Sequence, residues 1–285
     1  MAELIRAAAP PHRSHGMGLH REKLSGRRLE AMFSPAADAR TEMPDAIPVD
    51  VDKRFELDVD LMEPTGINAR IRELMREGYG HIVLKNPGAK HSVGVGILNR
   101  LKLDIEGSLG YFGVGLIDGP NVRISGRVGW SCAENMLAGT VVIEQNAGST
   151  FGAALRGGDL VCKGDVGART GIDMKGGTIL VGGRTGAFSG FMMQRGRMIV
   201  LGDAGKNLGD SMYDGVIYVG GSIAALGVDA VEAPMTPRDV SWLERKLGLY
   251  GMAAPKGTKN MTKVVAGKML WNYDSLEPAE KKIVL

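Results

Sequence analysis

The fold is decided by a stretch that reads GDVGARTGIDMKGG, from Gly164 to Gly177. The same spacing returns as GRTGAFSGFMMQRG, from Gly183 to Gly196, and again as GDAGKNLGDSMYDG, which starts at Gly202. All three copies follow the pattern GxxGxxxGxxMxxG, and every column advances with the same 19-residue period. A fixed period of this kind indicates a repeat architecture in which each copy is one structural unit.

Glycine columns extend the repeat back to Gly88, and Gly221 opens the last copy. We predict that these glycines are structural, because the chain either needs a positive φ angle at them or stacks too closely there for a Cβ atom. The predicted structural set is Gly126, Gly129, Gly148, Gly152, Gly164, Gly167, Gly171, Gly183, Gly186, Gly190, Gly202, Gly205 and Gly209. A phosphate-binding loop is the alternative, but such a loop occurs once, between a strand and a helix, whereas this element recurs.

Short β-prone segments separate the glycine blocks, and their apolar positions advance with the same period. One column contains Leu84, Leu103, Val122, Val141, Leu160, Ile179, Met198 and Ile217. The column two residues further on contains Asn86, Ile105, Ile124, Ile143, Cys162, Val181, Val200 and Val219. Residues two apart in a strand point to the same side, so we expect both columns to fill the interior of a stacked coil. The remaining core is assigned to Met136, Met174, Met193 and Met212, with Leu155 in register.

Units this short do not suit helical hairpin repeats, which need about 33 residues or more. They predict an all-β fold: a right-handed parallel β-helix of about seven to eight coils, with short flanking helices and extended terminal arms. We divide the chain into an arm at 1–50, a strand–helix cap at 51–79, the β-helix at 80–221, a cap helix within 222–250 and a tail at 251–285.

Both ends of such a rod need caps, because open strand edges invite aggregation. The alternating run Phe55–Leu61 predicts a half-buried strand, and a helix is expected to begin at Thr65. The expected apolar face of that helix consists of Ile67, Ile71, Leu74 and Met75. At the other end, Thr236 and Asp239 predict a capping box that opens a second helix. The expected apolar stripe of the second helix consists of Val240, Leu243 and Leu247.

The residue between the two interior columns points outward and changes character along the rod. It is polar at Lys85, Asp104 and Arg123. It then forms an apolar stripe of Val142, Val161, Leu180, Ile199 and Tyr218. Two interpretations stay open: the chain's own helix at 236–247 covers this stripe, or the stripe binds another protein. Trp271 and Tyr273 in the tail are further candidate partner contacts.

Candidate metal ligands are few. Cys132 and Cys162 form no C-x-x-C pair and cannot alone supply a zinc or iron–sulfur site. His12, His15 and His20 lie close in sequence, but no Cys or acidic ligand set accompanies them, so a solvated arm is the expected role.

Candidate acids and bases also have structural interpretations. Asp165, Asp203 and Asp210 flank the glycine columns, where hydrogen bonds to turn N–H groups are preferred over acid–base catalysis. His81 and His91 are expected to be satisfied or exposed. The sequence therefore predicts no catalytic residue, no cofactor-binding residue and no metal ligand.

Charge and hydropathy restrict the partners. The net charge is only +3 over 285 residues and forms no clustered basic run, so no nucleic-acid partner is expected. No stretch approaches the roughly 20 continuous apolar residues of a membrane-spanning helix. A cytoplasmic protein is the expectation.

Several stretches of the repeat and its flanks carry a family resemblance. They are residues 83–88, 133–140, 164–176, 209–213 and 222–232. They resemble the GXGXG domain at the C-terminus of the large subunit of glutamate synthase, and more closely the free-standing version of that domain. The resemblance covers roughly residues 65–250.

The resemblance implies a structural subunit of a larger enzyme. Free-standing versions occur beside a class-II glutamine-amidotransferase-like chain and an FMN-binding glutamate-synthase-like chain, as in methylamine–glutamate N-methyltransferase. Partner subunits would then hold the FMN. An iron–sulfur cluster in a partner subunit is a further option. The complex would make glutamate or N-methylglutamate in nitrogen or methylamine metabolism.

Three alternatives remain, one of which is a free ligand-binding module that a thermal-shift screen would reveal. Another is the role of the Gly-rich scaffold chain in a formylmethanofuran dehydrogenase or related hydrolase complex, which has a similar rod. The third is a self-sufficient β-helix enzyme, which needs clustered charged residues on an outward strand face. Only Asp104 and Arg123 are so placed in the outward column, and five apolar positions follow them.

Overall fold

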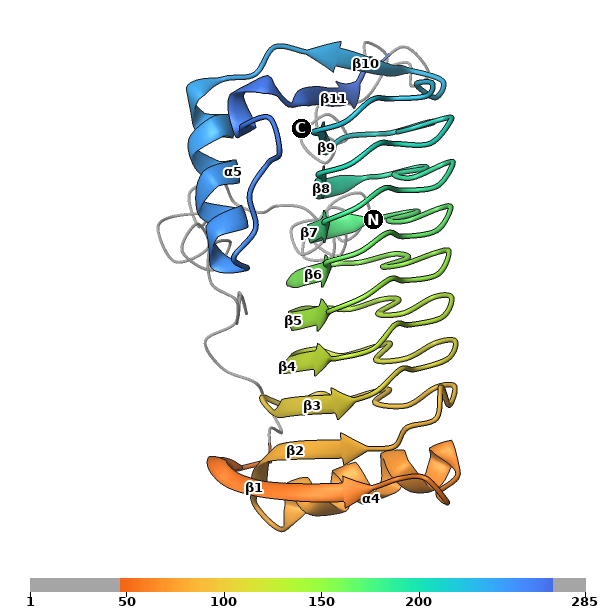
Figure 1. Ribbon diagram of the computed structural model, residues 1–285, viewed down its shortest axis with the longest axis vertical. Helices are drawn as coiled ribbons and strands as arrows, with labels where there is room; N and C mark the ends of the chain where they lie inside the picture. Colours follow the sequence, from red (N-terminus) through yellow and green to blue (C-terminus); the bar gives the residue numbers. More distant parts are fainter. Residues whose placement is uncertain (1–46, 269–285) are drawn as a thin grey trace, which may run out of the picture.

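The computed structural model describes residues 47–268. It is an elongated rod of stacked coils, with one helix across the lower end and another along one side near the upper end (Figure 1). Within the described chain, the eight parallel strands β2 to β9 form one continuous ladder along the rod. The fold is a right-handed parallel β-helix of about seven turns, as the repeat predicts.

The strands are short because each forms only one side of a coil. Their bounds are β2 Tyr79–Lys85, β3 Lys102–Glu106, β4 Asp118–Ile124, β5 Ala138–Ile143, β6 Asp159–Cys162, β7 Lys175–Val181, β8 Arg195–Val200 and β9 Val216–Val219. A column of single parallel bridges, from Leu109 and Val128 up to Ala204 and Ile223, joins the coils on a second side. The coils are therefore held to one another at two separate positions around the rod.

The pairing register follows the predicted period from β3 upward but not in the first coil. Ile82 pairs with Leu103 and Leu84 with Ile105, so this first step is two positions longer than the steps that follow. The prediction that Leu84 and Asn86 lead the two interior columns is therefore wrong by two positions. With Ile82 and Leu84 in those places, both columns are apolar at every position. Asn86 instead follows β2, where φ is 55°.

The two interior columns and the methionine column form the core. Every residue of the first interior column is at most 3% exposed, and the residues of the second interior column are buried to the same extent. All five members of the methionine column, Met136, Leu155, Met174, Met193 and Met212, are fully buried. Each fully buried aliphatic side chain contributes about 1.5–3 kcal/mol relative to an exposed one. The predicted core of the rod is confirmed.

The glycine columns serve two different purposes. At Gly171 and Gly190 the φ angles are +64° and +71°, in the left-handed region that favours glycine. At Gly186 the φ angle is ordinary, but a Cβ atom would lie only 2.5 Å from the backbone nitrogen of Ala168 in the preceding coil. One column therefore permits a turn, and the other permits the close stacking of coils.

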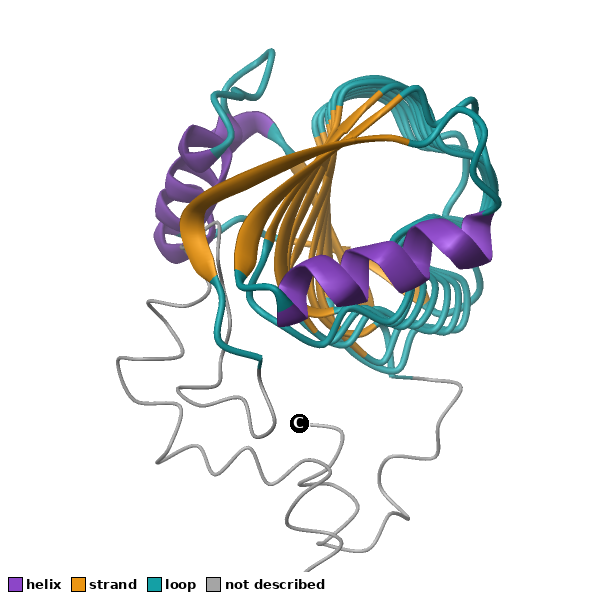
Figure 2. Cartoon of the chain, turned by 90° about the horizontal axis from the view of Figure 1, so that it is seen from below, coloured by secondary structure: helices purple, strands orange, loops and turns teal. Residues whose placement is uncertain are grey.

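The N-terminal cap consists of β1 Asp50–Asp58 and α4 Pro64–Arg76. β1 pairs in parallel with β2, and α4 lies across the open end of the rod (Figure 2). The buried residues of α4 are Ile67, Ile71, Leu74 and Met75, as predicted. The predicted strand alternation fails at Leu61, which is 97% exposed because the strand already ends at Asp58.

The C-terminal cap consists of β10 Ala230–Ala233, α5 Pro237–Leu249, the short 3-10 helix Thr258–Asn260 and β11 Thr262–Ala266. β11 runs antiparallel between β9 and β10, so it covers the strand edge that β9 would otherwise expose. Residues 251–268 are therefore part of the cap, which corrects the prediction of an extended tail from 251 onward. Trp271, Tyr273 and most of the predicted arm at 1–50 lie outside the described residues.

Candidate functional site

The outward apolar stripe is covered by α5. Val161, Leu180, Ile199 and Tyr218 are at most 1% exposed. They pack in one cluster with Trp242, Leu243, Leu247 and Met261, and Val142 is half-buried at the margin. In the described chain, these four buried residues are not available as the partner contacts that the sequence left open. The intramolecular interpretation is correct for them, because burial of the stripe holds α5 against β6 to β9.

The buried face of α5 differs from its predicted stripe. It consists of Trp242, Leu243, Lys246 and Leu247, whereas Val240 is only half-buried. Lys246 is a charged residue at a fully buried position, which the apolar periodicity does not predict.

Lys246 is neutralised by Asp159 of β6. Its Nζ atom lies 2.7 Å from both carboxylate oxygens of Asp159, and the hydroxyl of Tyr250 donates to Oδ2 at 2.5 Å. Burial raises the pKa of the Asp159 carboxyl group and lowers the pKa of the Lys246 ammonium, and the attraction between them opposes both shifts. The side chains of Asp159 and Lys246 are only 3% and 0% exposed, so this ion pair is buried. It anchors α5 to β6.

The N-terminus of α5 is fixed by a second polar cluster. Thr236 and Asp239 form the predicted capping box, with hydrogen bonds of 3.2 Å and 2.9 Å. Asp239 also accepts from the Tyr218 hydroxyl at 2.7 Å and from Lys263 of β11 at 2.9 Å. Burial alone would raise the pKa of Asp239, but these hydrogen bonds outweigh it and hold the pKa well below its usual range. One carboxylate thus joins α5, β9 and β11.

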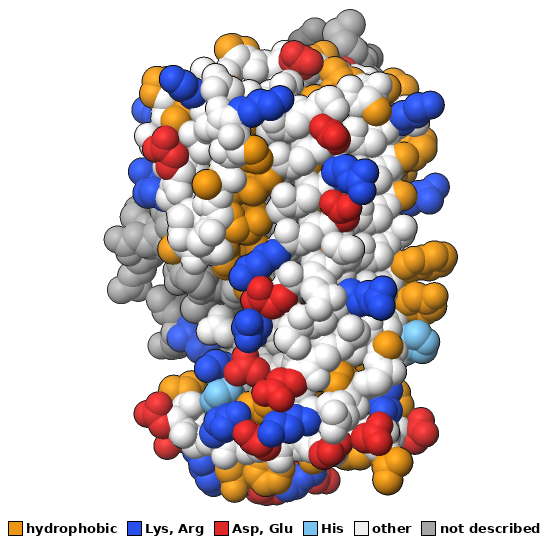
Figure 3. Space-filling model, viewed as in Figure 1, with side chains coloured by type: hydrophobic (Ala, Val, Ile, Leu, Met, Phe, Trp, Pro, Cys, Tyr) orange, Lys and Arg blue, Asp and Glu red, His pale blue; other side chains and the backbone are white. Residues whose placement is uncertain are grey.

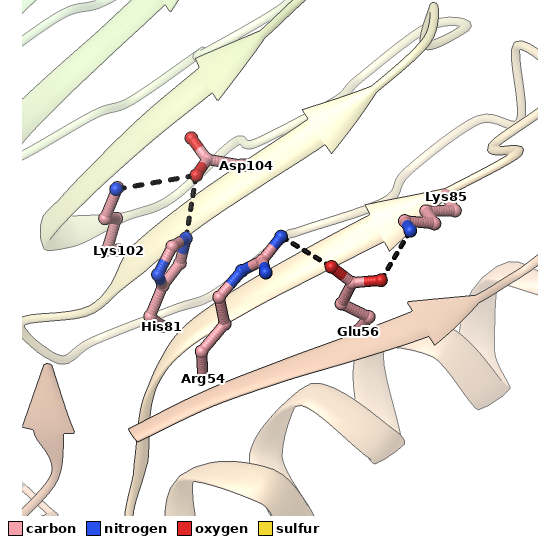
Figure 4. A network of polar contacts seen from close by, with 6 residues as sticks. All are labelled: Arg54, Glu56, His81, Lys85, Lys102 and Asp104. Atoms are coloured by element: carbon pink, nitrogen blue, oxygen red, sulfur yellow. Dashed lines mark hydrogen bonds and ion pairs between the residues drawn. The ribbon is translucent and has the colours of Figure 1, made fainter. Parts of the chain in front are cut away.

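A charged network lies on the outward face of the first strands, where α5 does not reach (Figure 4). The Nε2 atom of His81 lies 2.7 Å from Oδ2 of Asp104, and Nζ of Lys102 lies 3.7 Å from the same oxygen. His81 is therefore satisfied by a neighbouring strand, as expected.

A second, separate group of ion pairs surrounds Glu56 of β1, nearer the end of the rod (Figure 4). Arg54 contacts it at 2.6 Å, and Lys85 of β2 donates to its second oxygen. The hydrogen bond from Lys85 is the largest cause of the lowered pKa of Glu56. Solvent screens exposed pairs of this kind, so their charges protect the edge strand from pairing more than they stabilise the fold.

The corner acids bond to backbone N–H groups of the following coil. Asp165 accepts from the backbone nitrogen of Arg184 at 2.7 Å, and Asp203 accepts from that of Ser222 at 2.7 Å. Asp210 accepts from the backbone nitrogen of Val228 at 3.2 Å. The preferred interpretation of these three acids as turn ligands is therefore correct.

The two cysteines are buried free thiols. Burial raises the pKa of the Cys162 thiol to about 12 and raises that of Cys132 further. Within residues 47–268, no group of three or more His, Cys, Asp or Glu side chains is arranged to hold a metal ion. His12, His15 and His20 lie outside this range. No helix of the described chain is long and apolar enough to cross a bilayer.

Sequence reasoning missed an aromatic ladder at one corner of the first three coils, formed by His91, Tyr111 and Trp130. The rings of His91 and Tyr111 stack at 4.7 Å and 14°, and those of Tyr111 and Trp130 stack at 5.4 Å and 27°. The backbone nitrogen of Tyr111 donates to Nδ1 of His91 at 2.8 Å. Tyr111 and Trp130 are 42% and 58% exposed. The available signal was their spacing of one repeat, with a glycine directly before each.

These features define a class of protein: a capped parallel β-helix whose described polar clusters hold its own elements together. The model of the GXGXG motif family matches residues 63–235, which include the whole ladder of coils and α4. The chain belongs to the GXGXG motif family, which is associated with proteins of the glutamate synthase type. No curated protein matches the chain.

Proposed function

We propose that this chain is a non-catalytic structural subunit of a glutamate-synthase-type complex. It would hold a class-II glutamine-amidotransferase-like chain and an FMN-binding chain in register, so that ammonia or an amine reaches the flavin without loss. The observation that carries this proposal is the GXGXG family match over residues 63–235. FMN, with an iron–sulfur cluster as an option, would be held by the partner chains.

The physical properties of the rod suit a spacer. Its seven steps from β2 to β9 span roughly 34 Å at a strand spacing of about 4.8 Å. Backbone hydrogen bonds join every pair of consecutive coils at two positions, and both ends carry caps. Such an element resists bending and can fix the distance between two attached chains.

The described polar groups support the same proposal. Lys246 and Asp159 anchor α5, Asp239 joins three elements, and the corner acid Asp165 bonds to the next coil. Each is engaged in holding the fold together. We infer that the reactive groups of the complex belong to its other subunits.

The choice of a particular complex rests on the sequence resemblance. A set of three chains that makes N-methylglutamate or glutamate is the preferred complex, and the formylmethanofuran type is the alternative. The identity of the co-purifying chains separates the two, because one set would contain flavin and the other molybdenum-linked or methanofuran-linked subunits.

The direct test uses the purified full chain. Its absorbance spectrum after native purification should lack the flavin bands, and it should show no glutaminase or amine-dependent turnover. Mixed with the amidotransferase-like and FMN-binding chains, it should raise the fraction of glutamine nitrogen that is captured in product. Stoichiometric FMN in the purified single chain would contradict the proposal.

A further inference from the structure

The surface beneath α5 repeats from one coil to the next. The apolar stripe that α5 covers lies in register across the strands, since Val161 pairs with Leu180 and Leu180 pairs with Ile199. Neighbouring strands are about 4.8 Å apart, and one turn of an α-helix rises about 5.4 Å. A helix displaced along the rod by one coil would therefore meet nearly the same aliphatic surface. Apolar packing alone does not determine where α5 lies.

The stripe also extends beyond the part that α5 covers. Its positions from Val161 to Tyr218 are at most 1% exposed, whereas Val142 of β5 is only half-buried at the margin of the cluster. Figure 3 shows hydrophobic side chains as a band between α5 and the coils in the upper half of the rod, with charged side chains below it. A displacement of α5 by one coil toward β5 would cover Val142 and uncover Tyr218 of β9.

A second outward column beside the stripe does not repeat in the same way. Residues two positions before the stripe lie on the same face of each strand. They are Thr140, Asp159, Thr178, Arg197 and Val216. Asp159 is the one acid among these five, and it meets Lys246 of α5 at a buried position. The ion pair therefore distinguishes one coil from its neighbours, which the apolar stripe does not.

In a displaced helix, both charges of this pair would lose their partner. With α5 one coil nearer to β5, Lys246 would face Thr140. Because one coil corresponds to about three residues of helix, Asp159 would then face Leu243. A buried charge without a partner is strongly unfavourable, whereas the exchange of one aliphatic contact for another costs little. The pair thus penalises the displacement that the stripe would allow.

Contacts nearer the start of α5 agree with the observed register but hold it less strictly. The guanidinium carbon of Arg197 lies 4.6 Å from the ring centroid of Trp242, and Asp239 accepts from the Tyr218 hydroxyl. Arg197 is half-buried and the side chain of Asp239 is 13% exposed, so water can replace their partners when the helix moves. The buried pair at β6 is the contact that water cannot replace.

We propose that Asp159 and Lys246 form a register lock, which selects one position of α5 on a surface that would otherwise accept two. This role goes beyond anchoring, because apolar side chains in place of the pair would hold α5 without choosing a coil. Buried polar residues fix the register of coiled coils in the same way. Register matters here because residues 250–261 join α5 to β11, so a fixed helix keeps β11 in place at the edge of β9. The inference does not rest on the proposed function.

The test moves the aspartate by one coil in the full chain. Thr140→Asp/Asp159→Thr exchanges the two residues, and threonine suits position 159 because Thr140 and Thr178 are its strand neighbours. Hydroxyl-radical footprinting, read at the level of peptides by mass spectrometry, compares this variant with the parent. We expect Tyr218, which is 1% exposed in the parent, to be labelled severalfold faster, while Trp242 stays protected beneath the helix.

The matched control is Thr178→Asp/Asp159→Thr, which moves the aspartate by one coil in the opposite direction. The stripe ends at Tyr218 on that side, so α5 has no further aliphatic surface to occupy. Selective labelling of Tyr218 should therefore be absent from the control. The same selective labelling in both variants would overturn the lock, because any misplaced aspartate would then suffice.

The other outcomes are equally decisive. Protection of both rings in the exchange variant would overturn the lock, because α5 would then keep its position without the pair. Equal labelling of Tyr218 and Trp242 would also overturn it, because α5 would have detached rather than moved. Selective labelling of Tyr218 in the exchange variant alone is the result that supports the lock.

A second measurement covers an exchange variant that fails to fold. Asp159→Leu/Lys246→Met/Tyr250→Phe replaces the polar group with apolar side chains. The indole N–H of Trp242 should then give two NMR signals, or one at an intermediate shift, against a single signal in the parent. One signal at the parent's position would contradict the lock, because apolar packing would then choose the register by itself.

Discussion

Lys246 of α5 and Asp159 of β6 are 87 residues apart in sequence, yet the ammonium lies 2.7 Å from both carboxylate oxygens and both side chains are buried. This ion pair fixes the helix to the outward face of the coils. It also explains why a lysine occurs on an otherwise apolar helix face.

Removal of one partner of this pair should be costly. Lys246→Met leaves a buried, unpaired carboxylate and should lower the free energy of unfolding by about 3–5 kcal/mol, measured by chemical denaturation. The triple variant Asp159→Leu/Lys246→Met/Tyr250→Phe removes every member of the group and should be much less destabilised. Equal losses in the single and triple variants would show that the ion pair does not anchor α5.

Asp239 should make the C-terminal cap sensitive to acid. Its pKa is lower in the folded chain than in the unfolded chain, so its stabilising effect is present above the unfolded value of about 3.9 and is lost as pH falls toward the folded value. The difference in unfolding free energy between the parent and Asp239→Asn should therefore be largest near pH 6 and shrink between pH 4 and pH 2. A difference that stays constant across this range would contradict the assignment.

Close stacking of the coils should forbid a methyl group at Gly186. A Cβ atom there would lie 2.5 Å from the backbone nitrogen of Ala168, so Gly186→Ala should destabilise by about 1–3 kcal/mol or more. Gly248→Ala is the matched control, because nothing lies within 4 Å of its Cβ position in α5. It should be neutral or stabilise by about 0.5–1 kcal/mol. Thermal unfolding of the two variants checks both signs.

The two thiols should be inert in the folded chain. Cys132 and Cys162 are fully buried, and burial raises the pKa of Cys162 to about 12, so thiolate is scarce at neutral pH. Ellman's reagent at pH 8 should label neither thiol until a denaturant unfolds the rod. Rapid labelling of one thiol in native buffer would indicate that the coils open locally at that level.

Much of the rod could be predicted from sequence because residues of the same kind recur at the same positions in successive coils. The interior columns and the methionine column follow from spacing alone, and a single insertion of two residues before β3 displaced the first coil. The sequence could not show whether the chain's own helix or another chain covers the apolar stripe, because the apolar periodicity at Leu180 is the same in both cases. Lys246 could not be placed in a buried pair, because its partner is distant in sequence. The ladder was missed because exposed aromatic residues carry no periodic core signal.

The scaffold proposal is tested most directly by gentle affinity purification of the tagged full chain from its native cell, followed by identification and quantification of what accompanies it. We predict an amidotransferase-like chain and an FMN-binding glutamate-synthase-like chain in a fixed ratio to the tagged chain, with amine- or glutamine-dependent activity in the assembly. Recovery of the chain alone as a monodisperse rod, or together with molybdenum- or methanofuran-linked subunits, would contradict it.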